Sequence, residues 1–298
     1  MKILLLGKNG QVGWELQRSL APLGELIALD RRSTDLCGDL ADLDGISTTV
    51  SHVRPDVIVN AAAYTAVDKA ESDAATAHAV NAEAPGVLAE AASVVGAWLV
   101  HYSTDYVFDG SGSKPWEESD PTGPLNVYGR TKLEGEQRIA ARCAQHLILR
   151  TSWVYAARGG NFARTMLRLA RERDRLSVID DQFGAPTGAD LLADITAHMV
   201  RSALSGAAGD FAGIYHAAAA GETSWHGYAR FVVDCASEAG LDLKASPATV
   251  DPVPTTAFPT PATRPHNSRL NTAKLQASFG LQLPAWQQGV ARMLTEIT

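Results

Sequence analysis

The chain has 298 residues and carries 26 Lys and Arg against 33 Asp and Glu, which gives a formal net charge of −7. At about 150 residues per domain, this length allows one large domain or two smaller ones. Hydrophobic residues at 46% and charged residues at 20% are typical of a globular protein and exclude a disordered chain, a collagen-like repeat or a coiled coil. Because Lys and Arg form no long run, we expect no nucleic acid partner.

The N-terminus and the cysteines bear on the location of the protein. The apolar run at residues 3–6 is too short for a secretory signal, and no run approaches the roughly 18 apolar residues of a membrane span. Cys37, Cys143 and Cys235 form no CxxC pair, which predicts free thiols rather than disulfides or a zinc site. We therefore expect a cytoplasmic protein without a membrane partner.

Strands and helices are predicted to alternate through the first half of the chain. Short apolar runs predict strands at residues 2–6, 26–29, 56–60, 98–103 and 146–150. Helices are predicted between them at residues 11–23, 43–53, 74–95 and 128–144, with Pro85 breaking or kinking the third. Apolar strands separated by helices indicate a doubly wound parallel sheet, the Rossmann-type α/β fold.

The second half is less regular. Residues 161–173, 189–204 and 225–240 have helical patterns, and residues 213–217 predict a strand. Six prolines between Pro247 and Pro265 exclude a regular helix or a central strand and predict a long connection. We expect residues 151–298 to form a smaller C-terminal α/β region that is partly interleaved with the first half.

A GxxGxxG loop follows the first predicted strand and opens the first helix. Glycines permit a tight turn and a close approach to a pyrophosphate, and the helix N-terminus offers unpaired N–H groups. Asp30, at the end of the second strand, favours a dinucleotide site over a simple tight turn, because a carboxylate there accepts hydrogen bonds from ribose hydroxyls. The residues expected to bind the cofactor here are Gly7, Gly10, Gln11, Val12, Gly13 and Asp30.

The choice of cofactor stays open between NADH and NADPH. Asp30 would repel a 2′-phosphate, but Arg31 and Arg32 follow it and can pair with that phosphate. Asp39 and Leu40 are expected to cover the adenine, although a solvated loop acid explains Asp39 equally well.

The segment after the third strand adds small residues at the same edge of the sheet. Ala62, Ala63 and Tyr64 can let the cofactor backbone pass, although packing at the start of a helix would also explain the alanines. Together these features predict an NAD(P)-binding Rossmann-type domain over residues 1–150.

Tyr128 and Lys132 are four residues apart on one face of a predicted helix, at the carboxyl edge of the sheet. A phenol can protonate the alkoxide that hydride transfer to a ketone leaves, provided that a nearby ammonium lowers its pKa from about 10. Lys132 can also hold the nicotinamide ribose. Thr104, at the end of the fourth strand, can donate a hydrogen bond to the carbonyl oxygen, with Ser103 as its near competitor.

These residues resemble the catalytic triad of the extended short-chain dehydrogenase/reductases. Further stretches over essentially the whole chain narrow the resemblance to the dTDP-4-dehydrorhamnose reductase family. They are residues 10–13 (Gly-Gln-Val-Gly), 60–71, 103–110 (Ser-Thr-Asp-Tyr-Val-Phe-Asp-Gly), 150–155 (Arg-Thr-Ser-Trp-Val-Tyr), 181–187 (Asp-Gln-Phe-Gly-Ala-Pro-Thr), and Arg264, Pro265, Asn267, Ser268 and Leu270.

The resemblance implies reduction of the C4 ketone of dTDP-4-dehydro-6-deoxy-L-mannose to dTDP-L-rhamnose by NADPH or NADH. By analogy, Tyr128 is the proton donor, Lys132 tunes it and anchors the ribose, and Thr104 contacts the carbonyl. The small-molecule partner is thus a nucleotide sugar.

The same resemblance implies the residues that bind the substrate. Asp105 and Trp153 would face the sugar nucleotide, although a core position beside the fifth strand also explains a tryptophan. Arg264 would pair with the diphosphate. Asn267 and Ser268 are equally compatible with a turn.

Some members of the family are dimers with magnesium bridging carboxylates at the interface. Glu15 and Asp190 match two of these acids, but Arg292 stands where a third acid is expected. Magnesium and a homodimer therefore stay open, and we assign no residue as a metal ligand.

Two other functions share parts of this pattern. A reductase of another dTDP-4-keto-deoxysugar, of the dehydrostreptose type, would keep every catalytic residue. A non-catalytic NADP-binding subunit, like the regulatory subunit of methionine adenosyltransferase, would not need the Tyr–Lys pair, so its presence here favours an enzyme. A dehydratase would need Glu after Thr104-Asp105, where this chain has Tyr106.

Overall fold

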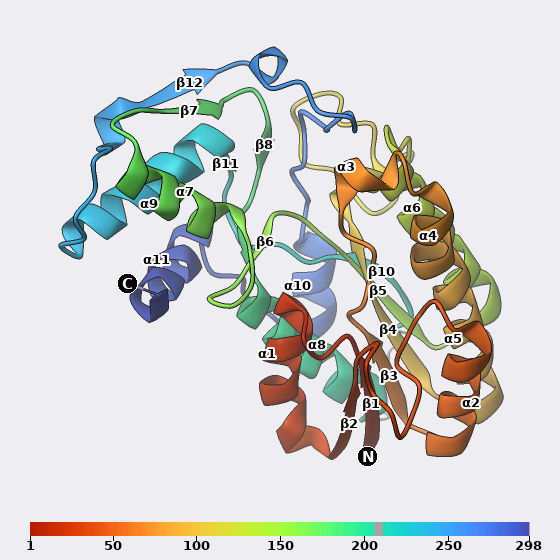
Figure 1. The fold of residues 1–298 in the computed structure, drawn as a ribbon. Coiled ribbons are helices and arrows are strands. Elements are labelled where there is room, and N and C mark those ends of the chain that lie inside the picture. Colours follow the sequence, from red (N-terminus) through yellow and green to blue (C-terminus); the bar gives the residue numbers. More distant parts are fainter. Residues whose placement is uncertain (206–210, 298) are drawn as a thin grey trace.

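A computed structural model describes residues 1–205 and 211–297. Its centre is a six-stranded parallel sheet in the order β10-β5-β4-β3-β1-β2 (Figure 1). The strands are β1 (Lys2–Leu6), β2 (Glu25–Leu29), β3 (Val57–Asn60), β4 (Trp98–Thr104), β5 (His146–Thr151) and β10 (Gly213–His216). The predicted doubly wound sheet is confirmed. The strand order reverses at β1 and β3, since β2 lies outside β1 whereas β4 and β5 follow on the other side of β3. In sheets of this kind, ligands bind at the carboxyl ends of the strands at that point.

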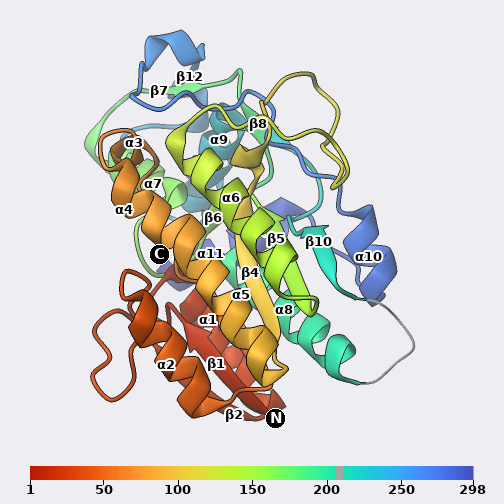
Figure 2. The same ribbon diagram turned by 90° about the vertical axis from the view of Figure 1, so that its right-hand side faces the viewer.

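Each face of the sheet is covered by helices because the side chains of β1 alternate. Ile3 and Leu5 pack with α1 (Gln11–Leu20) and α8 (Ala189–Leu204). Leu4 and Leu6 pack in the other cluster, with α2 (Leu43–Val53), α5 (Ala84–Val95) and α6 (Val127–Arg142), which lie side by side in Figure 2. Because both faces of the sheet are buried, a site is expected at the ends of the strands.

The helical segment predicted over residues 74–95 contains an unexpected turn. It consists of α4 (Ala74–His78), a π-helical turn (Ala79–Glu83) and α5, and a short α3 (Val67–Ala70) precedes it. Pro85 lies in the first turn of α5, where its missing N–H costs little, so the helical path continues through it. The widened turn comes just before the proline.

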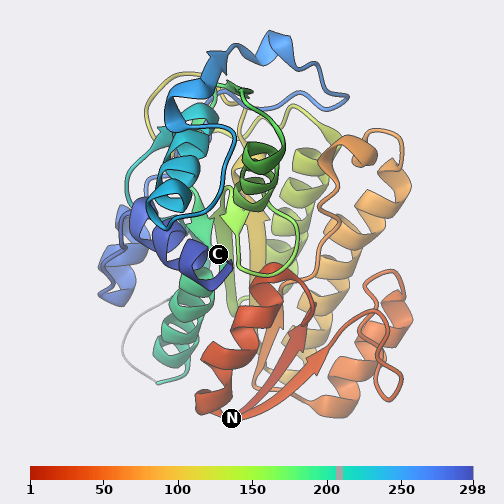
Figure 3. The ribbon, with the colours of Figure 1, turned by 60° about the vertical axis from the view of Figure 1, so that its left-hand side comes forward.

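The second half adds a layer at the carboxyl end of the sheet (Figure 3). Its helices α7 (Phe162–Glu172), α9 (Trp225–Glu238) and α11 (Trp286–Ile297) share a core around Tyr228, whereas α10 (Ala273–Phe279) packs near β10 and α8. Three two-stranded ladders complete it: β6 (Val154–Tyr155) with β9 (Thr187–Gly188), β7 (Leu176–Ile179) with β12 (Val250–Val253), and β8 (Phe183–Gly184) with β11 (Thr223–Ser224). The proline-rich segment thus contains one strand, β12, which pairs only with β7.

The structure also bears on the predictions about the cysteines and about membrane spans. Cys37, Cys143 and Cys235 are free, as predicted. In the described part of the chain, none of the helices combines the length and the apolar composition that crossing a bilayer requires.

Candidate active site

The glycine loop lies between the carboxyl ends of β1 and β3. Gly7 has a φ of 88°, and a Cβ on it would lie 2.8 Å from the backbone nitrogen of Ala62. A Cβ on Gly13 would overlap the carbonyl oxygen of Gly7, so the loop and α1 are in direct contact. Gly10 is the N-cap of α1 and places no side chain over the first N–H groups of the helix. The loop therefore fits the diphosphate of a dinucleotide.

Asp30 marks the end of β2 with a negative charge. Its carboxylate accepts hydrogen bonds from the side chain of Asn9 and, at 2.9 Å, from the backbone N–H of Arg32. The bond from Arg32 is the main cause that lowers the pKa of Asp30. Arg31 and Arg32 themselves are exposed. A group for ribose hydroxyls and groups for a 2′-phosphate therefore lie together, which is compatible with either cofactor.

Asp39 and Leu40 differ in their surroundings. The carboxylate of Asp39 accepts a hydrogen bond from the backbone N–H of Ala41 at 3.0 Å. The side chain of Leu40 is only 3% exposed and packs with Leu29 and Ile46 in the core. The side chain of Leu40 is therefore part of the core and not free to cover an adenine.

The turn after β3 is held by two buried asparagines that the sequence analysis missed. Asn60 accepts a hydrogen bond from the backbone N–H of Ala62 at 3.1 Å. Asn81, in the π-helical turn, accepts from the backbone N–H of Tyr64 at 2.9 Å and donates to its carbonyl oxygen at 3.0 Å. These bonds fix the backbone at Ala62 and Tyr64, and Ala62 lies beside Gly7.

The start of α6 places Tyr128 against the end of β4. Asn126 caps the helix by accepting from the backbone N–H of Gly129 at 2.8 Å, and it donates to the carbonyl oxygen of Thr263. A Cβ on Gly129 would overlap the carbonyl oxygen of Tyr106, so only glycine permits this approach. The rings of Tyr106 and Tyr128 then meet edge to face, with centroids 5.6 Å apart.

Lys132 is one turn further along α6 and is only 1% exposed. Its Nζ donates to the carbonyl oxygen of Tyr102 at 2.6 Å and lies 3.0 Å from Nε2 of His101. Burial lowers the pKa of Lys132 to about 8, and the negative charge of Glu136 opposes this shift.

Thr104 joins the end of β4 to Tyr128. Its hydroxyl accepts from the backbone N–H of Tyr106 at 3.2 Å and donates to Asp105 at 3.1 Å. It also lies close enough to Tyr128 to lower the pKa of that phenol, against the larger effect of burial. The hydroxyl of Ser103 is buried without a hydrogen-bond partner among the described residues. Of the two hydroxyls proposed for the carbonyl contact, that of Thr104 is the one beside Tyr128.

Burial raises the pKa of two groups at this site, Tyr128 and Asp105. We expected a nearby ammonium to lower the pKa of Tyr128, but burial raises it, because the phenolate would lose its hydration. The amine of Lys132 is instead bonded to Tyr102 and His101. Burial also raises the pKa of Asp105 to about 7. Both groups therefore hold a proton more firmly than they would in water.

Arg264 and Trp153 approach this region from the second half. Arg264 donates to Asp68 at 2.6 Å and to the hydroxyl of Tyr106 at 3.2 Å, so part of its guanidinium is already paired. Trp153 has a φ of 50° and stacks on Trp225 with ring centroids 3.6 Å apart. It also packs against the core around Tyr228, in line with the alternative of a structural tryptophan.

With this geometry in place, comparisons with known proteins are informative. The sequence model of the family described as "RmlD substrate binding domain" matches residues 1–298. The dTDP-4-dehydrorhamnose reductase of Escherichia coli (strain K12) is 61% identical over 297 residues, which are 100% of this chain and 98% of the relative. This chain belongs to the dTDP-4-dehydrorhamnose reductase family.

Solved structures of family members agree. The structure from Clostridium acetobutylicum has a TM-score of 0.89 at 35% identity and covers 100% of this chain and 99% of its own. The structure from Bacillus anthracis, in complex with NADP, has a TM-score of 0.88 at 33% identity and covers 99% of each chain. The predicted family and enzyme class are therefore confirmed.

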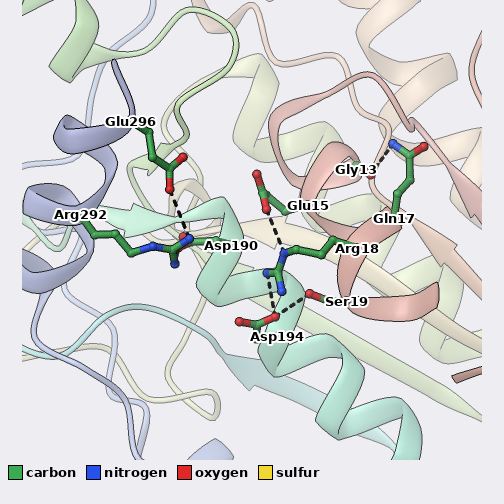
Figure 4. Close-up of polar contacts among 9 residues, drawn as sticks. All are labelled: Gly13, Glu15, Gln17, Arg18, Ser19, Asp190, Asp194, Arg292 and Glu296. Carbon is green, nitrogen blue, oxygen red and sulfur yellow. Dashed lines mark hydrogen bonds and ion pairs between the residues drawn. The ribbon is translucent and has the colours of Figure 1, made fainter. Parts of the chain in front are cut away.

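The magnesium site that the dTDP-4-dehydrorhamnose reductase family implies does not fit the residues present. Asp190 is paired with Arg292 at 2.8 Å, and Glu15 lies 3.5 Å from Arg18, which also pairs with Asp194 (Figure 4). In residues 1–205 and 211–297 no three His, Cys, Asp or Glu side chains are grouped so that they could hold a metal ion. Guanidinium groups occupy the neighbourhood of both acids.

The residues missed by sequence analysis share one kind of signal. Asn126 directly precedes the predicted helix and is a standard N-cap residue. Asn81 interrupts an alanine-rich helical stretch, where asparagine is unfavourable unless it bonds to backbone groups. Asn60 and His101 lie in apolar strands, where a polar side chain is costly without a partner. Each of them is a polar side chain at a position where it needs a hydrogen-bond partner.

Proposed function

We propose that this chain uses NADPH or NADH to reduce the C4 ketone of dTDP-4-dehydro-6-deoxy-L-mannose to dTDP-L-rhamnose. The observation that carries the proposal is the cluster of Thr104, Tyr128 and Lys132 at the carboxyl edge of the sheet, the same edge at which the glycine loop follows β1. The names of the family members support the substrate. A cytoplasmic location fits the three free cysteines.

Tyr128 is the proposed proton donor. When bound, the nicotinamide supplies the hydride. The hydroxyl of Tyr128 is protonated at neutral pH, and this proton passes to the C4 oxygen of the sugar as that oxygen becomes an alkoxide, which is a stronger base than the phenolate. The Thr104 hydroxyl, which otherwise donates to Asp105 at 3.1 Å, would turn to donate to the same oxygen and so hold the ketone beside the phenol.

Lys132 completes the site on the side of the cofactor. Its Nζ is fixed by the carbonyl oxygen of Tyr102, which leaves further donor capacity for the ribose hydroxyls. A positive charge on Lys132 stabilises the phenolate that Tyr128 becomes after it gives up its proton. Gly7, Gly10, Gly13 and Asp30 are proposed to hold the diphosphate and the adenosine ribose.

The sugar nucleotide is proposed to lie between the two halves of the chain. The guanidinium of Arg264 faces Asp68 and Tyr106 and can pair with the diphosphate. Asp105 and the ring of Trp153 are proposed to contact the sugar nucleotide.

The test is cofactor oxidation with dTDP-4-dehydro-6-deoxy-L-mannose generated in situ. We expect turnover with at least one of NADPH and NADH. Tyr128→Phe should lower turnover by about 10²–10⁴-fold and leave cofactor binding intact. Tyr228→Phe is the matched control, because it removes a buried tyrosine hydroxyl that has no partner among the described residues. Unchanged turnover in Tyr128→Phe, or no oxidation by the unmodified chain, would refute the proposal.

A further inference from the structure

His101 is a buried histidine that the proposed mechanism does not use. It lies in β4, is 1% exposed, and is enclosed between Asn60 of β3 and Lys132 of α6. Its Nδ1 is 3.2 Å from Nδ2 of Asn60, and its Nε2 is 3.0 Å from Nζ of Lys132. Both ring nitrogens are therefore committed to polar partners.

The partners of Asn60 determine which ring nitrogen of His101 carries the proton. Because the side-chain oxygen of Asn60 accepts from the backbone N–H of Ala62, its amide nitrogen faces His101 and donates to Nδ1. A neutral imidazole has one N–H, so the ring proton must be on Nε2. Burial and the neighbouring Lys132 lower the pKa of His101 well below its usual value, so the ring stays neutral.

The Nε2–H bond of His101 therefore points at the amine of Lys132. A neutral amine has a lone pair that accepts this bond, whereas an ammonium has none. For Lys132 to become charged here, the ring proton must move to Nδ1, so that Nε2 accepts from the ammonium. The amide of Asn60 must then turn its oxygen to Nδ1 and give up the hydrogen bond from Ala62.

The charged group next to Lys132 on α6 is already paired. Glu136, one turn further along α6, forms a buried ion pair with Arg150 of β5 at 2.6 Å. The groups that face Lys132 and its neighbours are His101, Tyr102 and Asp105 from β4 and its end, Tyr128 and Glu136 from α6, and Arg150 from β5. Of these, His101 alone contacts Nζ through a group whose donor direction can reverse.

We propose that His101 is a positioning residue that, together with Asn60, sets the pH at which Lys132 loses its proton and couples that proton to the turn at Ala62. The proposal rests on the proposed function, in which a charged Lys132 supports Tyr128. It implies that the hydrogen bond between Ala62 and Asn60 in the turn after β3 depends on the charge of Lys132.

Asn60→Asp tests the proton arrangement directly. A carboxylate at residue 60 can accept from both Ala62 and an Nδ1–H, so the ring proton moves to Nδ1 and Nε2 accepts from the Lys132 ammonium. The alkaline limb of the pH profile of kcat for ketone reduction should move to higher pH by about one unit, a tenfold change in the proton affinity of Lys132. His101→Gln, whose side-chain oxygen can accept from the ammonium, should move it in the same direction.

Thr196→Val is the matched control. Thr196 is fully buried and bonds to the hydroxyl of Tyr102 on the other face of β4, so the variant disturbs the same strand without touching Lys132. A merely structural role for His101 would lower thermal stability and leave the alkaline limb in place. An unmoved limb in folded Asn60→Asp and His101→Gln would overturn the proposal.

A second measurement needs neither activity nor a variant. In the unmodified chain labelled with ¹⁵N-histidine, the NMR shifts of the His101 ring should report a protonated Nε2 and an unprotonated Nδ1 at pH 9. A protonated Nδ1 at that pH would overturn the proposal. If the chain reduces no ketone, the proposed function fails, whereas this ring measurement still decides the arrangement around His101.

Discussion

Arg150 and Glu136 form an ion pair beneath the helix that carries Tyr128 and Lys132, with Nη2 2.6 Å from Oε2 and side chains only 3% and 2% exposed. Removing one partner leaves a buried charge without compensation. We expect Arg150→Met to lower the free energy of unfolding by about 3–5 kcal/mol, measured by urea denaturation. The double variant Arg150→Met, Glu136→Leu should regain most of this loss.

An exposed ion pair provides the comparison. Arg168 and Glu172 pair at 2.9 Å on α7, with side chains 60% and 51% exposed. Arg168→Ala should change the free energy of unfolding by no more than about 0.5 kcal/mol. Similar losses in Arg168→Ala and Arg150→Met would show that the uncompensated buried charge of Glu136 is not what destabilises Arg150→Met.

Asp105 predicts a pH dependence of stability. Burial raises its pKa from 3.8 to about 7, so between these values the folded chain holds a proton that the unfolded chain releases. This group therefore makes the free energy of unfolding fall as pH rises through that range, by about 4 kcal/mol in total. We compare Asp105→Asn with the unmodified chain by urea denaturation. The free energy of unfolding of the variant, minus that of the unmodified chain, should be larger at pH 8 than at pH 5. An equal difference at both pH values would contradict the raised pKa.

Alanine substitutions at Gly7 and Gly96 distinguish the effect of backbone strain from that of steric overlap. Gly7→Ala combines a φ of 88° with a Cβ 2.8 Å from the nitrogen of Ala62, whereas Gly96 has a φ of 75° and open space around its Cβ position. Gly96→Ala should cost about 1 kcal/mol of stability and leave NADPH binding unchanged. Gly7→Ala should cost more and weaken NADPH binding at least about tenfold, because the turn at Ala62 must move. Calorimetric titration with NADPH distinguishes the two.

The ion pair between Asp190 and Arg292 predicts independence from divalent metals. Its guanidinium already neutralises Asp190, and both Arg292 and the acids around it are partly exposed. Turnover and the thermal midpoint should be the same after treatment with a chelator and after addition of Mg²⁺. Loss of activity in the chelator, restored by Mg²⁺, would show that the acids at Glu15 and Asp190 bind a metal despite the arginine.

The parts of the fold that sequence analysis predicted are those fixed by local patterns. The bounds of β1, α2 and α8 agree with prediction because an apolar run or an amphipathic face fills one layer of the core. The ladders β6 with β9 and β8 with β11 have two residues in each strand, which is too short for a periodic signal. They form because segments that are far apart in the sequence meet over the core around Tyr228.

The same distinction applies to the site. Tyr128 and Lys132 could be predicted as a pair because helical spacing alone places them on one face. The contact between Lys132 and His101 spans 31 residues and arises only when α6 packs across β4. The acidities of Tyr128 and Asp105 likewise depend on how deeply the fold buries them, which spacing does not reveal.

The position of β10 has a consequence for how the chain is made. β10 pairs with β5 at the edge of the central sheet, although about 60 residues separate them in the chain. While the ribosome produces that interval, the N–H and C=O groups on the side of β5 away from β4 have no strand beside them and can recruit another nascent chain. A fragment ending at residue 150 would carry this open edge permanently, so we expect it to aggregate.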